Sequence, residues 1–215
     1  LGLMLVMFSI AYAIPVATSL IYADYTMLLD FLLAMVWTAA AGVLMWMLTR
    51  RHKGELSIRH GYLLVVAMWT AMPAVATLPL LLVIPGLSFT DAYFETISGI
   101  TTTGATVLTG LDTLPPAINL WRHELNWLGG MGIIVLAVAI LPLLGVGGMQ
   151  MYKAETPGPM KDSKLTPRIT ETAKGLYLVY AGISLACGLA YWLAGMTLFD
   201  AVMHTFSTMG LGGFS

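Results

Sequence analysis

The chain has 215 residues, of which 58% are hydrophobic and 10% are charged. Soluble domains carry about a quarter charged residues, so this composition, with a mean hydropathy of +0.84, excludes an ordinary soluble protein. A formal net charge of −1 gives no electrostatic reason to expect a nucleic-acid partner. The single cysteine, Cys187, excludes a disulfide within the chain and is interpreted as a small packing residue.

Apolar residues are gathered into five blocks that contain no Asp, Glu, Lys or Arg. A helix needs about 20 such residues to cross about 30 Å of hydrocarbon, and each block is near or above that length. We therefore predict five membrane spans, within residues 1–22, 31–49, 61–90, 126–152 and 175–199. The first block lacks the basic start and the cleavage site of a signal peptide. We interpret it as a retained span and expect the natural start to precede Leu1.

The charged residues between the spans predict the orientation. All but one of the basic residues fall in two loops, which hold Arg50, Arg51, Lys53 and Arg59, and Lys153, Lys161, Lys164, Arg168 and Lys174. The other loops carry acidic residues, namely Asp24, Asp30, Asp91, Asp112 and Asp200. Short loops rich in Lys and Arg remain cytoplasmic. The two basic loops are therefore predicted to face the cytoplasm and the acidic loops the outside. Five spans that cross in alternating directions place the loops in this way.

Residues 85–126 face outside in this scheme, but they do not have the composition of an ordinary polar loop. Residues 89–100 are predicted to form a helix that is too short to span, with Asp91 capping its start. Residues 101–106 are polar yet uncharged. A membrane tolerates irregular backbone only where it is buried in protein or lines a water-filled cavity. We therefore predict a re-entrant hairpin.

The same pattern recurs later in the chain. A shift of 109 positions places Asp91 on Asp200, Thr96 on Thr205, Ser98 on Ser207 and Gly104 on Gly213. The preceding spans, residues 61–84 and 170–193, also correspond. Repeated units of this kind commonly surround a shared pathway. The predicted fold is an all-α polytopic membrane protein with two extra N-terminal spans followed by helix–pore loop–helix repeats, the second of which is incomplete.

This repeat divides the chain into four regions. Residues 1–60 hold two N-terminal transmembrane helices and a basic cytoplasmic loop, and residues 61–150 form the first repeat. Residues 151–170 are a cytoplasmic connector. Residues 171–215 form the second repeat, which stops within its loop.

Uncharged loops of this kind suit a potassium ion. Backbone carbonyls replace the water shell of K+ without the deep trap that a carboxylate would make. Glycine permits the backbone conformations that turn carbonyls toward an axis, and a short helix presents negative charge at its C-terminal end. The predicted filter comprises Thr101, Thr102, Thr103, Gly104 and Ala105 in the first loop, and Leu211, Gly212, Gly213 and Phe214 in the second. Carbonyls around Thr102, Thr103, Leu211 and Gly212 would bind K+, and Asp91 and Asp200 would cap the pore helices.

Other polar residues leave alternatives open. Glu95, whose repeat partner is His204, is either a functional residue of the pathway or, as we favour, a structural anchor that accepts bonds from loop amides. Arg122, His123 and Glu124 form either a proton-linked relay or, as we favour, a cluster at the membrane interface. The glycines at 129–132 and 145–148 are interpreted as sites of close helix packing.

Two other functions compete with ion conduction. A secondary transporter of another small solute would place a charged or aromatic specificity group near Gly104 or Gly213, and neither loop carries a charge. An intramembrane enzyme would need a nucleophile or a metal-binding set at membrane depth, and none stands out. We therefore predict a protein that is not an enzyme and has no covalently bound cofactor, with K+ as the transported ion.

Four stretches resemble the membrane subunit of the bacterial Trk potassium uptake system. They are FETISGITTTGATVLTGLDTLP, WLGGMGIIVLAVAILPLLGVGGMQMYKAETPGP, KLTPRITETAKGLY and HTFSTMGLGGFS, and the similarity covers essentially the whole chain. The resemblance implies four fused pore-loop units around one pathway, with filter glycines at Gly104 and Gly213 in the first two. Because four loops complete the ring, we expect two further units beyond Ser215 and no conducting pore from these residues alone.

The resemblance also implies a setting and partners. Members of this family are homodimers in the bacterial inner membrane, in contact with lipid. They work with a cytosolic nucleotide-binding regulatory subunit of TrkA type, which would dock on the cytoplasmic loops. Channel-like conduction and symport with H+ or Na+ are both compatible with the residues present.

Overall fold

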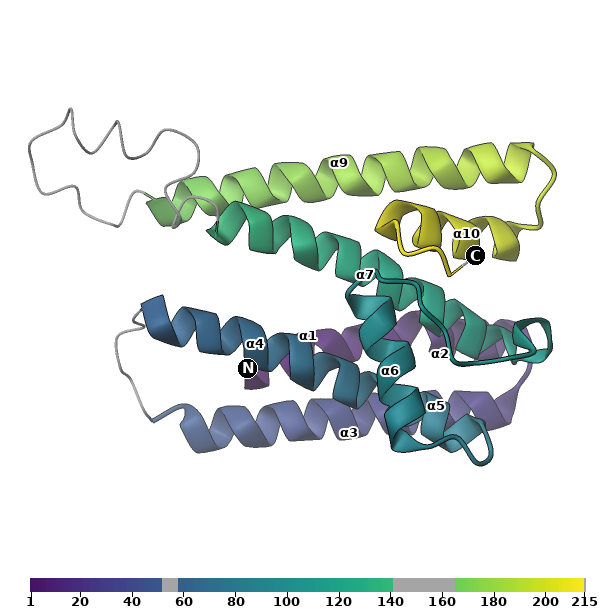
Figure 1. The fold of residues 1–215 in the computed structure, drawn as a ribbon, viewed down its shortest axis with the longest axis horizontal. Coiled ribbons are helices and arrows are strands. Elements are labelled where there is room, and N and C mark those ends of the chain that lie inside the picture. Colours follow the sequence, from purple (N-terminus) through teal and green to yellow (C-terminus); the bar gives the residue numbers. More distant parts are fainter. Residues whose placement is uncertain (52–57, 141–164, 215) are drawn as a thin grey trace, which may run out of the picture.

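The computed structural model describes residues 1–51, 58–140 and 165–214. Every regular element in these ranges is a helix (Figure 1), which confirms the predicted all-α fold. Most of the connector predicted at 151–170 lies outside the described residues, as do the glycines at 145–148 and the end of the fourth predicted span.

Two long helical segments form an N-terminal hairpin. Their elements are α1 (Gly2–Ser9), η1 (Ile10–Tyr12), α2 (Ala13–Ile21) and α3 (Tyr25–Thr49). The 3-10 turn η1 lies just before Pro15, which lacks the N–H that would bond to the carbonyl of Ala11. Asp24 caps α3 by accepting a hydrogen bond from the N–H of Met27 at 3.1 Å. This cap lets α3 begin before residue 31, where the uncharged block starts.

The third span is interrupted near its C-terminal end, where α4 (Ile58–Ala76) gives way to α5 (Leu78–Val83). Pro79 has no N–H, so the carbonyl of Val75 lacks its helical partner. The hydroxyl of Tyr12 donates to that carbonyl at 2.9 Å, and the indole N–H of Trp121 donates to the carbonyl of Ala76 at 3.1 Å. Two buried aromatic side chains thus satisfy backbone oxygens that hydrocarbon would leave unpaired.

Two short helices lie on either side of a long one. α6 (Phe89–Ile100) has the bounds that the sequence predicts, and α10 (Leu198–Gly210) is its counterpart in the second repeat. Figure 1 shows that both cover only part of the length of the bundle and that α7 (Pro116–Ile140) passes between them, in contact with each. The remaining elements are η2 (Leu111–Thr113) and α9 (Leu165–Leu193).

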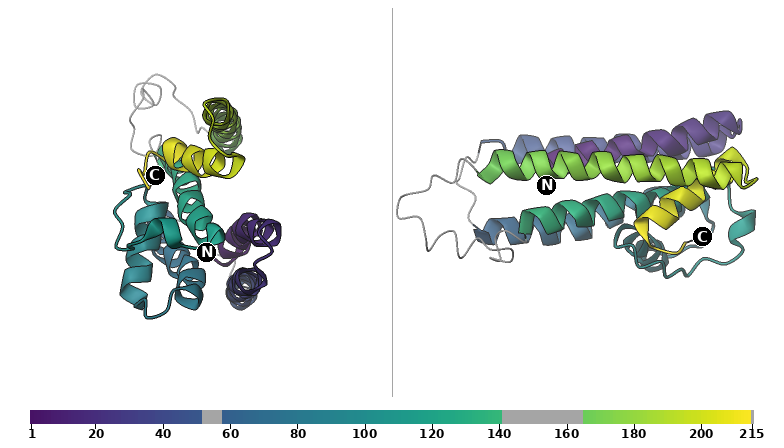
Figure 2. Two further views of the ribbon diagram at one scale, coloured as in Figure 1. Left: turned by 90° about the vertical axis from the view of Figure 1, so that its right-hand side faces the viewer. Right: turned by 90° about the horizontal axis from the view of Figure 1, so that it is seen from above.

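The ends of the long helices agree with the predicted alternation of spans. The C-terminal end of α3 and the N-terminal ends of α4 and α9 lie at the same end of the bundle (Figures 1 and 2). The two basic loops adjoin these ends in the sequence. Both short helices lie toward the opposite end of the bundle, as a re-entrant hairpin entered from outside requires.

The buried core lies where the N-terminal hairpin meets α7. Trp121 is fully buried, stacks on Tyr12 with ring centroids 4.5 Å apart and meets Phe31 edge-on. Elsewhere large apolar side chains face outward, as Trp37 on α3 and Leu178 on α9 do. Among the described residues, four helical segments are long and apolar enough to cross a membrane, namely 2–21, 25–49, 60–83 and 171–193. The chain is a multi-pass membrane protein.

We expect Gly42→Ala to destabilise the N-terminal hairpin. A Cβ at Gly42 would lie 2.7 Å from the carbonyl oxygen of Gly2 and 2.8 Å from a methyl carbon of Val6, so α1 and α3 would have to separate. Overpacking of this kind costs about 1–3 kcal/mol. Thermal unfolding of the purified full-length protein should show a lower midpoint. Gly182→Ala, whose added Cβ meets no atom within 4 Å, is the control, and equal midpoints would contradict the close contact.

Candidate functional site

The two short helices begin with the same local motif. The hydroxyl of Ser88 caps α6, accepting from the N–H of Asp91 at 3.1 Å and donating to its carboxylate at 2.7 Å. Thr197 caps α10 through Asp200 in the same way, at 3.2 and 2.7 Å. The prediction that Asp91 and Asp200 are themselves the caps is therefore wrong. Both carboxylates lie in the first helical turn, where the helix dipole favours negative charge.

The loops that follow these helices share a backbone conformation. Thr102 and Gly104 have φ angles of +56° and +75°. The residues related to them by the shift of the repeat, Leu211 and Gly213, have φ angles of +57° and +71°. A left-handed conformation costs a non-glycine residue about 1–2 kcal/mol. Its recurrence at equivalent positions indicates that both loops meet the same structural requirement.

The same hydrogen bond closes both turns. After α6 the N–H of Thr103 donates to the carbonyl of Ser98 at 2.9 Å, and after α10 the N–H of Gly212 donates to the carbonyl of Ser207 at 3.3 Å. Donors and acceptors are related by the shift of the repeat. The repeat detected in the sequence is therefore also a repeat of backbone structure.

The two loops lie against each other. A Cβ added to Gly104 would overlap the carbonyl oxygen of Gly212, so this position has no space for a side chain. Two glycines of α7 allow the close approach. A Cβ at Gly129 would overlap the carbonyl oxygen of the last residue of α6, and a Cβ at Gly130 would lie 3.2 Å from the Cα of the last residue of α10. The packing role predicted for these two glycines is confirmed.

The side chains of the predicted filter residues have different surroundings. The hydroxyl of Thr101 donates to a carbonyl of α6 at 2.7 Å and lies 2.8 Å from the hydroxyl of Thr103. Ala105 is exposed, and Leu211 is 88% exposed. Phe214 instead packs inward and is 7% exposed. Some side chains of the two loops are thus exposed, whereas others bond to or pack against the protein.

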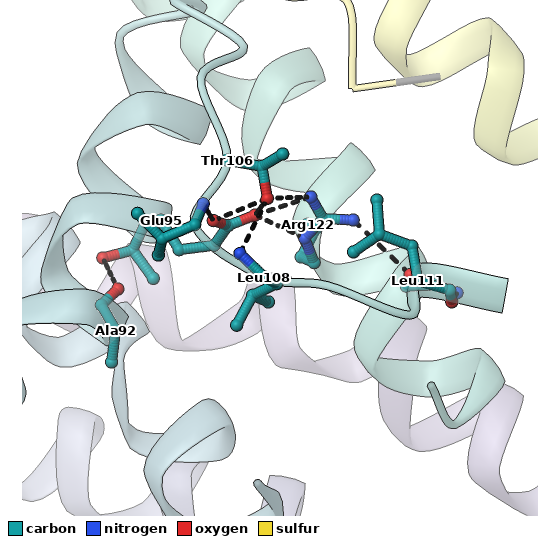
Figure 3. Close-up of polar contacts among 9 residues, drawn as sticks. Ala92, Glu95, Thr106, Leu108, Leu111 and Arg122 are labelled. Carbon is teal, nitrogen blue, oxygen red and sulfur yellow. Dashed lines mark hydrogen bonds and ion pairs between the residues drawn. The ribbon is translucent and has the colours of Figure 1, made fainter. Parts of the chain in front are cut away.

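Glu95 holds the first loop from behind (Figure 3). Its carboxylate accepts from the hydroxyl of Thr106 at 2.9 Å and from the N–H of Val107 at 3.1 Å. It also forms an ion pair with Arg122, whose Nε donates to Oε1 at 2.6 Å. Both charged side chains are 1% exposed. The contact expected of the anchor that we favoured is present, because Glu95 accepts a bond from one loop amide, that of Val107.

The polar residues of α7 are buried inside the protein. α7 begins at Pro116 rather than near residue 126, so Arg122, His123 and Glu124 lie inside the helix. They are 1%, 6% and 1% exposed. The prediction placed the start of the span where the charges end, but here the charges are buried against neighbouring helices and the helix extends past them.

His204 does not repeat the role of Glu95. Its ring faces those of His123 and Tyr191, with centroids 6.3 and 6.1 Å apart. The two repeats therefore share backbone geometry but support their loops differently. Within the described ranges, no group of three or more His, Cys, Asp or Glu residues is placed to hold a metal ion. Within residues 101–106 of the first loop, the side-chain oxygen atoms are threonine hydroxyls.

A family model described as TrkH, cation transport protein, matches residues 28–215. The chain belongs to the TrkH family. It is 52% identical over its whole length to the Trk system potassium uptake protein TrkH of Vibrio parahaemolyticus and 54% identical to the protein of that name from Halomonas elongata. It is also 41% identical to the Trk system potassium uptake protein TrkG of Escherichia coli. It covers 44%, 45% and 44% of these relatives.

A solved TrkH structure has the same fold. The crystal structure of the potassium transporter TrkH from Vibrio parahaemolyticus superimposes with a TM-score of 0.81 at 47% sequence identity. The match covers 96% of this chain and 41% of that one. The chain thus spans less than half the length of the TrkH proteins that it resembles.

Two features of the site were not recognised in the sequence. The caps have a signal, because Ser88 and Thr197 each precede an aspartate by three positions, which is the spacing of a capping box. The pairing of Glu95 with Arg122 has a weaker signal in the sequence. Both charges lie among mostly apolar residues, Glu95 four positions after Asp91 and Arg122 two positions before Glu124, and ionisable groups at membrane depth tend to pair with one another.

We expect Glu95→Gln to destabilise the protein strongly. The substitution leaves the buried guanidinium of Arg122 without its counter-charge, and breaking one side of a buried ion pair costs about 3–5 kcal/mol. Thermal unfolding of the full-length protein in detergent, together with the yield of inserted protein, measures the loss. Glu171→Gln makes the same chemical change at an exposed position of α9 and should be neutral. Similar stability of the two variants would show that the ion pair does not hold the structure.

Proposed function

We propose that this chain is the N-terminal part of a potassium-translocating subunit of a Trk-type uptake system. In the full-length protein its two loops would supply two of the four pore loops that surround a K+ pathway. One observation carries the proposal. Two short helices are followed by uncharged loops with left-handed residues at the same two positions, and these loops touch each other at Gly104 and Gly212. The names of the TrkH and TrkG relatives support potassium as the ion.

The chemistry of the loops fits a dehydrated monovalent cation. Left-handed residues change the direction in which neighbouring carbonyls point, and rings of carbonyls replace the hydration shell of K+. The proposed ligands are the carbonyls around Thr102 and Thr103 in the first loop and around Leu211 and Gly212 in the second. α6 and α10 end at these loops, so the negative ends of both helix dipoles favour a cation there.

The same proposal covers the setting of the protein. The basic residues at one end of the bundle would face the bacterial cytoplasm, as expected for an inner-membrane protein. A cytosolic nucleotide-binding subunit of TrkA type would dock on that face, and the subunit would assemble as a homodimer. The apolar side chains exposed along α3 and α9 would contact lipid or the remainder of the protein.

We expect Gly104→Ser in the full-length subunit to weaken the selectivity for K+ over Na+ while the protein still inserts. A Cβ at this position would overlap the carbonyl oxygen of Gly212, so the two loops must move apart. A distortion worth 1.4 kcal/mol changes an affinity ratio about tenfold, and we expect a loss of about that size. Rubidium uptake with sodium as competitor, in cells that lack other potassium uptake systems, measures it.

Gly86→Ser is the matched control. Gly86 has nearly the same φ angle as Gly104, +77° against +75°, but a Cβ there meets no atom within 4 Å. It therefore bears the same backbone strain away from the loops. Unchanged selectivity in Gly104→Ser would contradict the proposed filter. Uptake of another small solute, rather than of rubidium, by the wild type would favour a secondary transporter instead.

A further inference from the structure

The side chain of Arg122 contacts both loops. On one side its guanidinium binds Glu95 and donates from Nη2 to the hydroxyl of Thr106 at 3.2 Å (Figure 3). On the other side its central carbon lies 4.5 Å from the centroid of the Phe214 ring. A guanidinium is attracted to the face of an aromatic ring, more strongly where water is excluded. Arg122 and Phe214 are 1% and 7% exposed, so this condition holds.

The ring of Phe214 ties the second loop to the first repeat. Phe214 directly follows Gly213, and its Cε2 atom lies 3.4 Å from the place where a Cβ on Gly99 of α6 would be. The residue related to Phe214 by the shift of the repeat is Ala105, whose methyl group cannot make a stacked contact. The contact is therefore a feature of the second loop that the repeat does not reproduce.

We propose that Arg122 is a positioning residue that sets the separation of the two loops and thereby the discrimination between K+ and Na+. Its effect on transport rests on the proposed function, whereas its effect on loop separation does not. The ion pair with Glu95 anchors the guanidinium to α6. Phe214 then cannot move away without uncovering one face of a buried cation. The second loop is thus held in place relative to the first through one side chain of α7.

Two substitutions interrupt this link at opposite ends. Arg122→Lys keeps the positive charge beside Glu95 but lacks the planar group that donates two parallel bonds and stacks on a ring. Phe214→Leu keeps an apolar side chain at the buried position and removes the aromatic face. Neither leaves a buried charge without a counter-charge, so both variants should fold. Phe94→Leu, which alters an exposed aromatic residue of α6, is the matched control.

Loop separation is measured directly with spin labels. Cysteines replace the exposed residues Thr109 and Leu211 in a full-length protein that carries Cys187→Ala, and the labelled protein is reconstituted in lipid vesicles. We expect the distribution of distances between the labels to widen in Arg122→Lys and in Phe214→Leu and to stay unchanged in Phe94→Leu. Unchanged distributions in both linking variants would overturn the proposal.

Transport supplies the second measurement, in proteins without spin labels. A cation–π contact away from water is worth about 2 kcal/mol, so each linking variant should lower the preference for K+ over Na+ about thirtyfold. The double variant should lose no more of its preference for K+ over Na+ than the more affected single variant. Either substitution alone already breaks the contact between Arg122 and Phe214. Additive losses, or lower yield with normal selectivity, would overturn the proposal. A wild-type protein without a K+ preference would refute the proposed function, and the label distances would still test the positioning role.

Discussion

A charge buried away from water is stable only beside its counter-charge, and in this protein that constraint acts on Glu95 and Arg122. The pair joins α6 to α7, and the same carboxylate accepts bonds from Thr106 and Val107 of the loop. The loop after Gly104 therefore cannot shift without disturbing the ion pair. Helix packing, loop conformation and charge balance depend on one another at this point.

α7 links this site to the rest of the chain through consecutive residues. Trp121 packs into the N-terminal hairpin and donates to a carbonyl at the break before α5, whereas Arg122 reaches the loops. Further along, Gly129 and Gly130 let the ends of α6 and α10 approach the helix backbone. The two extra N-terminal spans thus support the helix from which both loops are positioned.

The two repeats have the same backbone conformation, but different side chains hold their loops in place. Caps, left-handed positions and closing hydrogen bonds correspond residue by residue. At the positions that hold the loops, Glu95 corresponds to His204 and Ala105 to Phe214. A backbone arrangement of this kind requires the same conformation from each unit, but the neighbours behind each loop differ, so each unit carries its own supporting side chains.

The sequence alone determined what depends on local composition: the helical class, most of the spans, the bounds of α6 and the repeat. Length and apolarity decide whether a segment enters hydrocarbon, and both are visible in the chain. The tertiary structure alone decided that α7 begins before its charged residues, that Arg122 meets Glu95 and that Phe214 covers its other face. These outcomes depend on which buried groups lie within bonding distance, and only the packing of distant helices brings them together.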